Sequence, residues 1–170
     1  MQANFNIGFK NFWARLTVIL AVVPAVACLA WSVPARAQSQ DVQGWWVDGS
    51  GKAGIFISPC DGQLCGKVEW LRVPLDKAGK PKTDIHNDNP ALRPRLLCGL
   101  PILGGFKPGN DGSWRGGWIY DPESGNTYKS VMHVGDDGKL HVRGFIGITL
   151  IGRSTVWSKP AAPPTPCTGG

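Results

Sequence analysis

The stretch Cys60-Asp61-Gly62-Gln63-Leu64-Cys65 decides the fold, because it predicts a tight turn between two β-strands. Residues with high β-propensity precede it at 55–57 and follow it at 68–70. A two-residue Gly62-Gln63 loop in a type II′ turn would leave Asp61 opposite Leu64 and Cys60 opposite Cys65. Opposed cysteines at a non-hydrogen-bonded pair lie within reach of a disulfide. The stretch therefore predicts an oxidised β-hairpin.

Similar turn signals divide the rest of the chain and leave little room for helices. They are Asp48-Gly49-Ser50-Gly51, Asn110-Asp111-Gly112, Glu123-Ser124-Gly125-Asn126 and Asp136-Asp137-Gly138. Between them we expect strands near 42–48, 53–59, 65–72, 100–106, 114–120, 126–134, 139–146 and 149–158. Eight short antiparallel strands joined mostly by hairpins predict an all-β meander barrel, because closure removes exposed sheet edges. A β-sandwich is the alternative.

The N-terminus predicts a signal peptide over residues 1–37. Lys10 and Arg15 precede an apolar run, and Ala35-Arg36-Ala37 supplies a small-x-small cleavage site. The run is shorter than the ~20 apolar residues of a spanning helix, so a membrane anchor is the weaker alternative, as is a lipoprotein acylated at Cys28. We therefore expect a periplasmic or secreted protein that does not span the membrane once the signal is cleaved.

Charge gives no argument for a nucleic-acid partner. Residues 1–37 carry three basic side chains and no acidic one, so their removal halves the formal net charge of +6. The remaining cations are spread along the chain. We place a single domain at 38–159 and a Pro-rich, disordered tail at 160–170.

Four cysteines remain after Cys28 is removed, and an even number fits disulfides in an oxidising compartment. The hairpin geometry favours Cys60 with Cys65, which leaves Cys98 and Cys167 paired or free. A bridge from the hairpin to Cys98 is the alternative, and it would tie the base of the following loop shut. A bridged Cys167 would pin the tail.

Candidate ligand-binding residues come from one strand and from the long connection 73–99. Alternation places the aromatic residues of strand 114–120 on one face, which is either core or the wall of a cavity. The long connection adds charged side chains, and Asn89-Pro90 is expected to start a helical turn in it. The candidates are Trp114, Trp118, Tyr120, Asp84, Arg93 and Arg95. The alternative for 73–99 is a lid over one barrel end, with Asp84 paired to the arginines.

Motifs for common catalytic sites and cofactors are absent from the sequence. His133 and His141 would be cross-strand neighbours around a turn, but no third metal ligand is evident. We expect no metal ion and no cofactor.

The chain resembles the bacterial DUF2147 family, a domain of unknown function that is typically exported. The resemblance rests on an ordered series of motifs: Gly44 and Trp46, Cys60 to Lys67, Asp84 to Arg95, Cys98 to Leu100, Gly116 to Pro122, Arg143 to Gly147, and Gly152 to Trp157. It also resembles lipocalin-like (calycin) barrels, in which a first-strand Gly-x-Trp packs beneath an Arg of the last strand. The resemblance implies that Trp46 and Arg153 close one end of the barrel.

Three functions are compatible with these features. Non-catalytic binding of a small amphipathic or apolar ligand is the first, because aromatic residues alternate with glycine beside a cationic loop. An envelope interaction or scaffold module is the second. The third is an enzyme centred on 73–99, with Asp84 as its acid or base.

Overall fold

The structure is a computed structural model that describes residues 42–167. The expected signal peptide and Cys28 lie outside the described residues. In the part of the chain that is described, no helix has the length and apolar character needed to cross a membrane.

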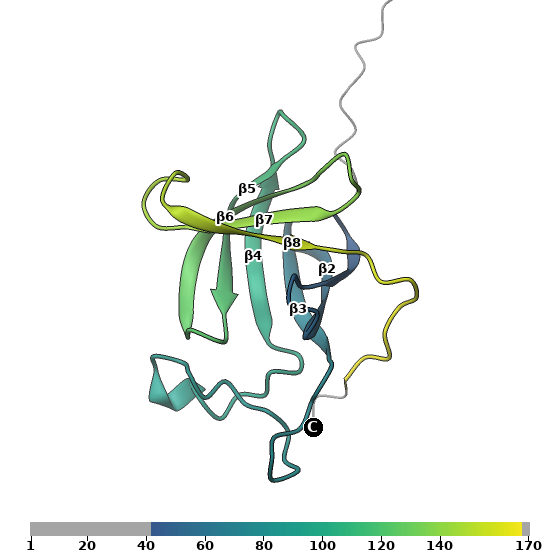
Figure 1. Ribbon diagram of the computed structural model, residues 1–170. Coiled ribbons are helices and arrows are strands. Elements are labelled where there is room, and N and C mark those ends of the chain that lie inside the picture. The colour runs from purple at the N-terminus through teal and green to yellow at the C-terminus, as the bar shows by residue number, and fades with distance from the viewer. Residues whose placement is uncertain (1–41, 168–170) are drawn as a thin grey trace, which may run out of the picture. The chain divides into compact units, whose positions relative to one another are not determined.

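Eight strands form one antiparallel sheet, and each strand pairs with its neighbours in sequence (Figure 1). They are β1 (Gly44–Val47), β2 (Ala53–Cys60), β3 (Gln63–Leu71), β4 (Pro101–Pro108), β5 (Trp114–Asp121), β6 (Asn126–Val134), β7 (Leu140–Phe145) and β8 (Gly152–Trp157). Every strand bound lies within three residues of the expected one. The expectation of an all-β meander is confirmed.

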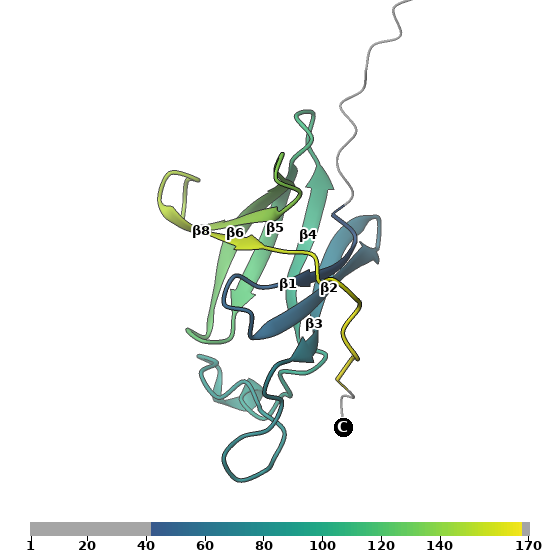
Figure 2. The same cartoon turned by 45° about the vertical axis from the view of Figure 1, so that its right-hand side comes forward.

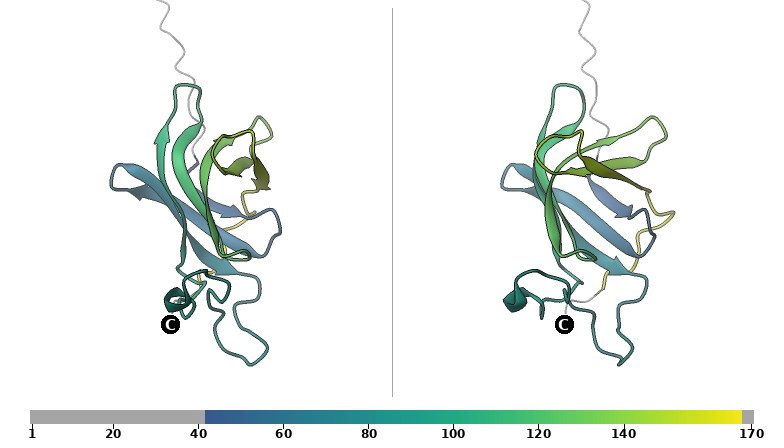
Figure 3. Two further views of the ribbon diagram at one scale, coloured as in Figure 1. Left: turned by 90° about the vertical axis from the view of Figure 1, so that its left-hand side faces the viewer. Right: turned by 60° about the vertical axis from the view of Figure 1, so that its left-hand side comes forward.

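The sheet curls on itself into a partial barrel (Figures 2 and 3). Its two edges meet where Val47 N donates to Ser158 O at 2.8 Å and Ser158 N donates to Val47 O at 3.0 Å. One continuous sheet with joined edges excludes the β-sandwich alternative.

Large apolar side chains line the concave side of the sheet. Those with almost no exposed surface are Val42, Trp46, Ile55, Ile57, Leu103, Phe106, Met132, Leu140 and Val142. Two glycines make room for them. A Cβ atom at Gly117 would lie 2.5 Å from the ring of Phe106, and one at Gly66 would lie 2.5 Å from Leu103 Cδ1. Side chains at these two positions would displace the core.

The cysteine hairpin has a different register from the expected one. Cys60 pairs with Gln63 and Cys65 with Ser58, so the loop is Asp61-Gly62. Both loop residues have positive φ, 46° and 74°, which defines a type I′ turn. The Cys60–Cys65 disulfide forms as predicted, but across a diagonal of the ladder, with 5.8 Å between the Cα atoms. Gly62-Gln63 was the wrong loop, because Asp61 and Gly62 both adopt the positive φ of a type I′ turn, for which Asp-Gly is a favoured pair.

The long connection lies at one end of the sheet (Figure 1). It contains one short 3-10 helix, η1 (Pro90–Leu92), whose N-cap Asn89 accepts a hydrogen bond from Ala91 N at 3.0 Å. The predicted helix start is therefore confirmed. A β-bridge between Thr83 and Leu96 holds the two arms of the connection together.

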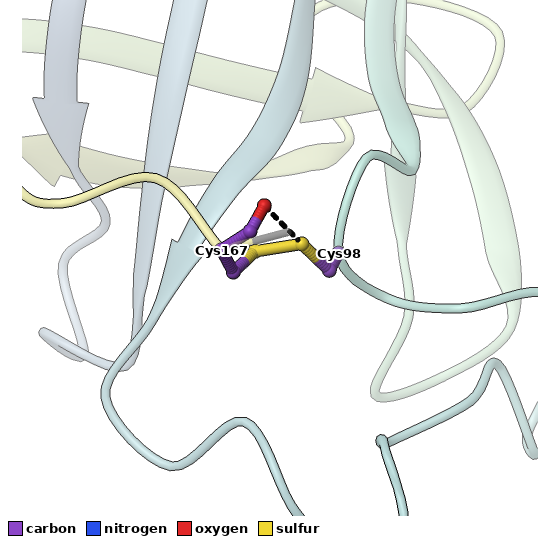
Figure 4. Close-up of a disulfide and its surroundings, with 2 residues drawn as sticks. All are labelled: Cys98 and Cys167. Atoms are coloured by element: carbon purple, nitrogen blue, oxygen red, sulfur yellow. Dashed lines mark hydrogen bonds between the residues drawn. A yellow bond between two sulfur atoms is a disulfide. The ribbon is translucent and has the colours of Figure 1, made fainter. Parts of the chain in front are cut away.

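A second disulfide, Cys98–Cys167, joins the end of the long connection to the C-terminal tail (Figure 4). Cys167 N also donates to Glu69 O at 2.7 Å. The alternative bridge from the hairpin to Cys98 is excluded, since each hairpin cysteine is bonded to the other. The bridge fixes the tail to the domain at Cys167, as expected for a bridged Cys167.

Candidate functional site

The aromatic residues of β5 do not share one face, contrary to expectation. The pairing of β5 with β6 shifts register between Trp114 and Gly117, and Gly116 there has φ of +74°. This β-bulge adds a residue to one strand, so residues on either side of it change face. Gly117 faces the core, and Trp118 therefore points to the outside of the curled sheet.

Trp114 lies on the inner side, at the start of β5. It is opposite the fully buried Met132 and packs, partly exposed, against the edge of the core. Its indole nitrogen Nε1 is buried. Among the side chains of residues 42–167, this is the buried polar atom that has no hydrogen-bond partner. A buried donor without an acceptor costs about 1–3 kcal/mol, so it requires a physical explanation.

Trp118 and Tyr120 share the outer face of β5 but have different surroundings. The ring of Trp118 covers Gly104 on β4, where a Cβ atom would lie 3.0 Å from the ring, and the side chain remains 38% exposed. Tyr120 lies two residues further along the same strand, and it is only 7% exposed. Its hydroxyl meets side chains of the long connection.

These side chains form a closed polar cluster of Asp84, Asn87, Arg95 and Tyr120. Tyr120 Oη donates to Asp84 Oδ1 at 2.6 Å. Asp84 Oδ2 accepts from Arg95 Nη2 at 2.7 Å and from Asn87 Nδ2 at 2.9 Å. Asn87 Nδ2 also donates to Tyr120 Oη at 2.8 Å. Every member therefore has a partner within the cluster.

The cluster holds the long connection against β5. Asp84 is completely buried, and a buried carboxylate is tolerated only when it is paired and hydrogen-bonded. Because Asp84 is completely buried and both of its oxygens are hydrogen-bonded to protein groups, a substrate does not reach the carboxylate in this arrangement. The arrangement favours the lid interpretation of 73–99 over an enzyme centred on Asp84.

Arg93 joins this region without reaching Asp84. Its Nε donates to the backbone oxygen of Asn87 at 2.8 Å. Asn87 was not predicted as a site residue, although its spacing of three from Asp84 in a loop suits a local turn, and Asn87 N does donate to Asp84 O at 3.0 Å. The structure therefore brings together Asp84, Arg93, Arg95 and Tyr120, and leaves Trp114 at the opposite end of β5.

The barrel closure that was expected from Trp46 and Arg153 is made by another cation. Lys159 Nζ lies 5.2 Å from the centre of the Trp46 ring, and Trp46 Nε1 donates to Val42 O at 2.8 Å. Arg153 is exposed and lies opposite Gly144 in the β7–β8 ladder. Lys159 takes the role because it follows directly after Ser158, which is paired with β1.

The two strand histidines are cross-strand partners, as predicted. His133 pairs with His141, and their rings stack with centroids 5.1 Å apart. Within residues 42–167 there is no group of three or more His, Cys, Asp or Glu side chains placed to hold a metal ion.

Residues 44–159 match the family described as an uncharacterized protein conserved in bacteria, DUF2147. The chain belongs to the DUF2147 family. Among solved structures, this DUF2147 domain is similar to HP1028 from Helicobacter pylori, which is described as belonging to the lipocalin family. The two are 20% identical, the match covers 71% of this chain and 84% of HP1028, and the TM-score is 0.61. No functionally curated protein matched the sequence. The fold of the DUF2147 domain is lipocalin-like.

Titration of Tyr120 tests the geometry of the polar cluster. Burial, and then the neighbouring Asp84, raise the pKa of Tyr120 above its usual value near 10. Because the unfolded chain ionises first, the stability from Tyr120 is complete below pH ~10 and is lost as the pH rises through the folded pKa.

The chain has two tyrosines, so ultraviolet titration of a Tyr128→Phe variant reports on Tyr120 alone. We expect a midpoint clearly above that of a tyrosine model peptide. A midpoint at the model value would mean that Tyr120 is hydrated and that the cluster is open.

Proposed function

We propose that this DUF2147 domain is an exported, non-catalytic binding protein that takes up a small amphipathic or apolar molecule on the concave side of its sheet, next to Trp114. The lipocalin-like fold supports this proposal, because its curled sheet surrounds an apolar interior. Two disulfides support export, since such bonds persist in oxidising compartments.

The unpartnered indole N–H of Trp114 is the observation that carries the proposal. It requires an acceptor such as a carbonyl or carboxylate oxygen, while the apolar surroundings favour a hydrocarbon body. Trp114 and Val134 are only partly buried against the core, so the proposal places the entrance of the site beside them. A ligand with one oxygen-bearing head and an aliphatic chain suits both features.

Binding at Trp114 leaves no direct role for the other candidate residues. Trp118 lies on the outer face, and Asp84, Arg95 and Tyr120 are engaged with one another at the far end of β5. Arg93 is bonded to the backbone of the lid. The head of the ligand therefore meets the Trp114 N–H instead of the arginines.

Native mass spectrometry tests whether a ligand is bound. Protein purified without detergent is expected to retain a small molecule or, after oleate is added, to form a one-to-one complex. Displacement of a fluorescent fatty acid by oleate then gives its affinity. A protein that retains nothing and takes up neither fatty acid would contradict the proposal.

A further inference from the structure

The loop between β7 and β8 exposes four large aliphatic side chains to solvent. Ile146, Ile148, Leu150 and Ile151 are 67%, 60%, 83% and 64% exposed. The loop projects from the sheet, so these side chains form an apolar tip (Figure 1). Single exposed aliphatic residues are common, but four within six positions mark an interaction surface.

The apolar tip, residues 146–151, is held in a fixed conformation. Ile146 N donates to Ile151 O at 3.0 Å, and Ile151 N donates to Ile148 O at 3.1 Å. Arg143 supports the loop from β7, donating from Nε to Thr149 O at 2.6 Å and from Nη2 to Leu150 O at 3.1 Å. A loop held in this way loses little backbone entropy when it binds a surface.

The charged side chains on the two strands that lead into the tip, and on the adjacent end of β6 at Lys129, are basic. Lys129 lies opposite Phe145, Arg153 lies opposite Gly144, and both are exposed. The sequence from 138 to 170 contains no Asp or Glu. The tip carries aliphatic side chains at its end and cations at its base. It is therefore complementary to a surface whose outer layer is negatively charged and whose deeper layer is apolar.

We propose that the apolar tip inserts into the surface of a membrane that contains anionic lipids, with Lys129 and Arg153 at the level of the headgroups. Aliphatic side chains at such a boundary reach ~5–10 Å into it, a depth that suits a short loop. A second copy of the chain is the less suitable occupant, because it would bring two cationic flanks together. This surface is distinct from the concave site at Trp114, and the two proposals stand separately.

Vesicle flotation of the purified full-length protein tests the proposal. We expect binding to vesicles of phosphatidylcholine mixed with phosphatidylglycerol, and weaker binding to phosphatidylcholine alone or in high salt. An Ile148→Ser/Leu150→Ser variant should bind about a hundredfold more weakly, because each aliphatic side chain contributes roughly tenfold. The matched control is Val73→Ser/Ile85→Ser, which removes two exposed aliphatic side chains of the lid and should bind like the wild type.

A second variant keeps the test informative should the serine variant fold poorly. Lys129→Gln/Arg153→Gln leaves the apolar tip intact and should lose the preference for anionic vesicles. The apolar N-terminal segment is the same in every variant, so a difference in flotation between the variants reports on the tip alone. Equal flotation of the wild type and the Ile148→Ser/Leu150→Ser variant would therefore overturn the proposal. The proposal would also be overturned if the wild type did not float but formed a dimer, and if the serine substitutions dissociated that dimer. The tip would then be the interface with a second copy of the chain.

Discussion

Replacing Cys98 and Cys167 together with alanine is expected to lower the free energy of unfolding by about 4 kcal/mol. The disulfide joins residues that are 69 positions apart, so it strongly restricts the unfolded chain. The matched control is Cys60→Ala/Cys65→Ala, which opens a bridge between residues only five apart and should cost about 2 kcal/mol. Removing cysteines in pairs avoids a free thiol. Urea unfolding of the three proteins measures the difference.

The two disulfides should also differ in what they hold in place. Cys98 is at the end of the lid, and the next residue, Gly99, donates from its backbone N to Val68 O at 2.7 Å. On the other side of the bridge, Cys167 N donates to Glu69 O. Loss of this bridge frees the tail and loosens the lid, so proteolysis should begin within the lid or the tail. Equal destabilisation by the two pairs of substitutions, or cleavage that begins in the strands, would contradict this role.

The Asp84→Asn substitution is expected to cost about 3 kcal/mol, because it breaks a buried ion pair. If the new amide pointed its NH₂ group at Arg95 Nη2 and Asn87 Nδ2, donor would face donor. If it pointed at Tyr120, the hydroxyl would have to rotate and accept, and the charge that pairs with Arg95 would still be lost. Arg95 is 40% exposed and can be hydrated, which keeps the loss at the lower end of the usual range.

Asp88→Asn is the matched control for this substitution. Asp88 lies in the same connection but is exposed, so the change should alter stability by less than about 0.5 kcal/mol. Chemical unfolding gives both values, and amide hydrogen exchange locates the loss, which we expect in 83–96 before the strands. A cost below about 1 kcal/mol for Asp84→Asn would show that the carboxylate is not the fastening point of the lid.

Local turn chemistry made most of the fold predictable. Gly-containing turns located five of the seven connections between the strands, and the Asn89-Pro90 pair located η1. The one wrong turn, at Asp61-Gly62, arose because the sequence offers two adjacent loop solutions, and the positive φ of Asp61 decides between them. A shift by one residue changes the partner of every residue in the hairpin, but the diagonal still lets Cys60 reach Cys65.

The candidate site was harder to predict because it depends on contacts between distant residues. Asp84 and Tyr120 are 36 positions apart, and nothing local indicates that they meet. The separation of Trp114 from Trp118 had a signal, the Gly116-Gly117 pair, because glycine inside a strand is typical of a bulge. Simple alternation ignores that signal and places both rings on one face. Lys159 replaced Arg153 at Trp46 because the closing contact lies just beyond the last strand.

The affinity for a fatty acid in Trp114→Phe and Trp118→Phe variants tests ligand binding at the concave site most directly. Each substitution keeps an aromatic ring and removes one indole N–H, but Trp114 lies on the inner side and Trp118 on the outer face. We predict saturable one-to-one binding of oleate to the wild type, about tenfold weaker binding to Trp114→Phe through loss of one hydrogen bond, and unchanged binding to Trp118→Phe. Equal affinity of all three proteins, or the absence of saturable binding to the wild type, would contradict it.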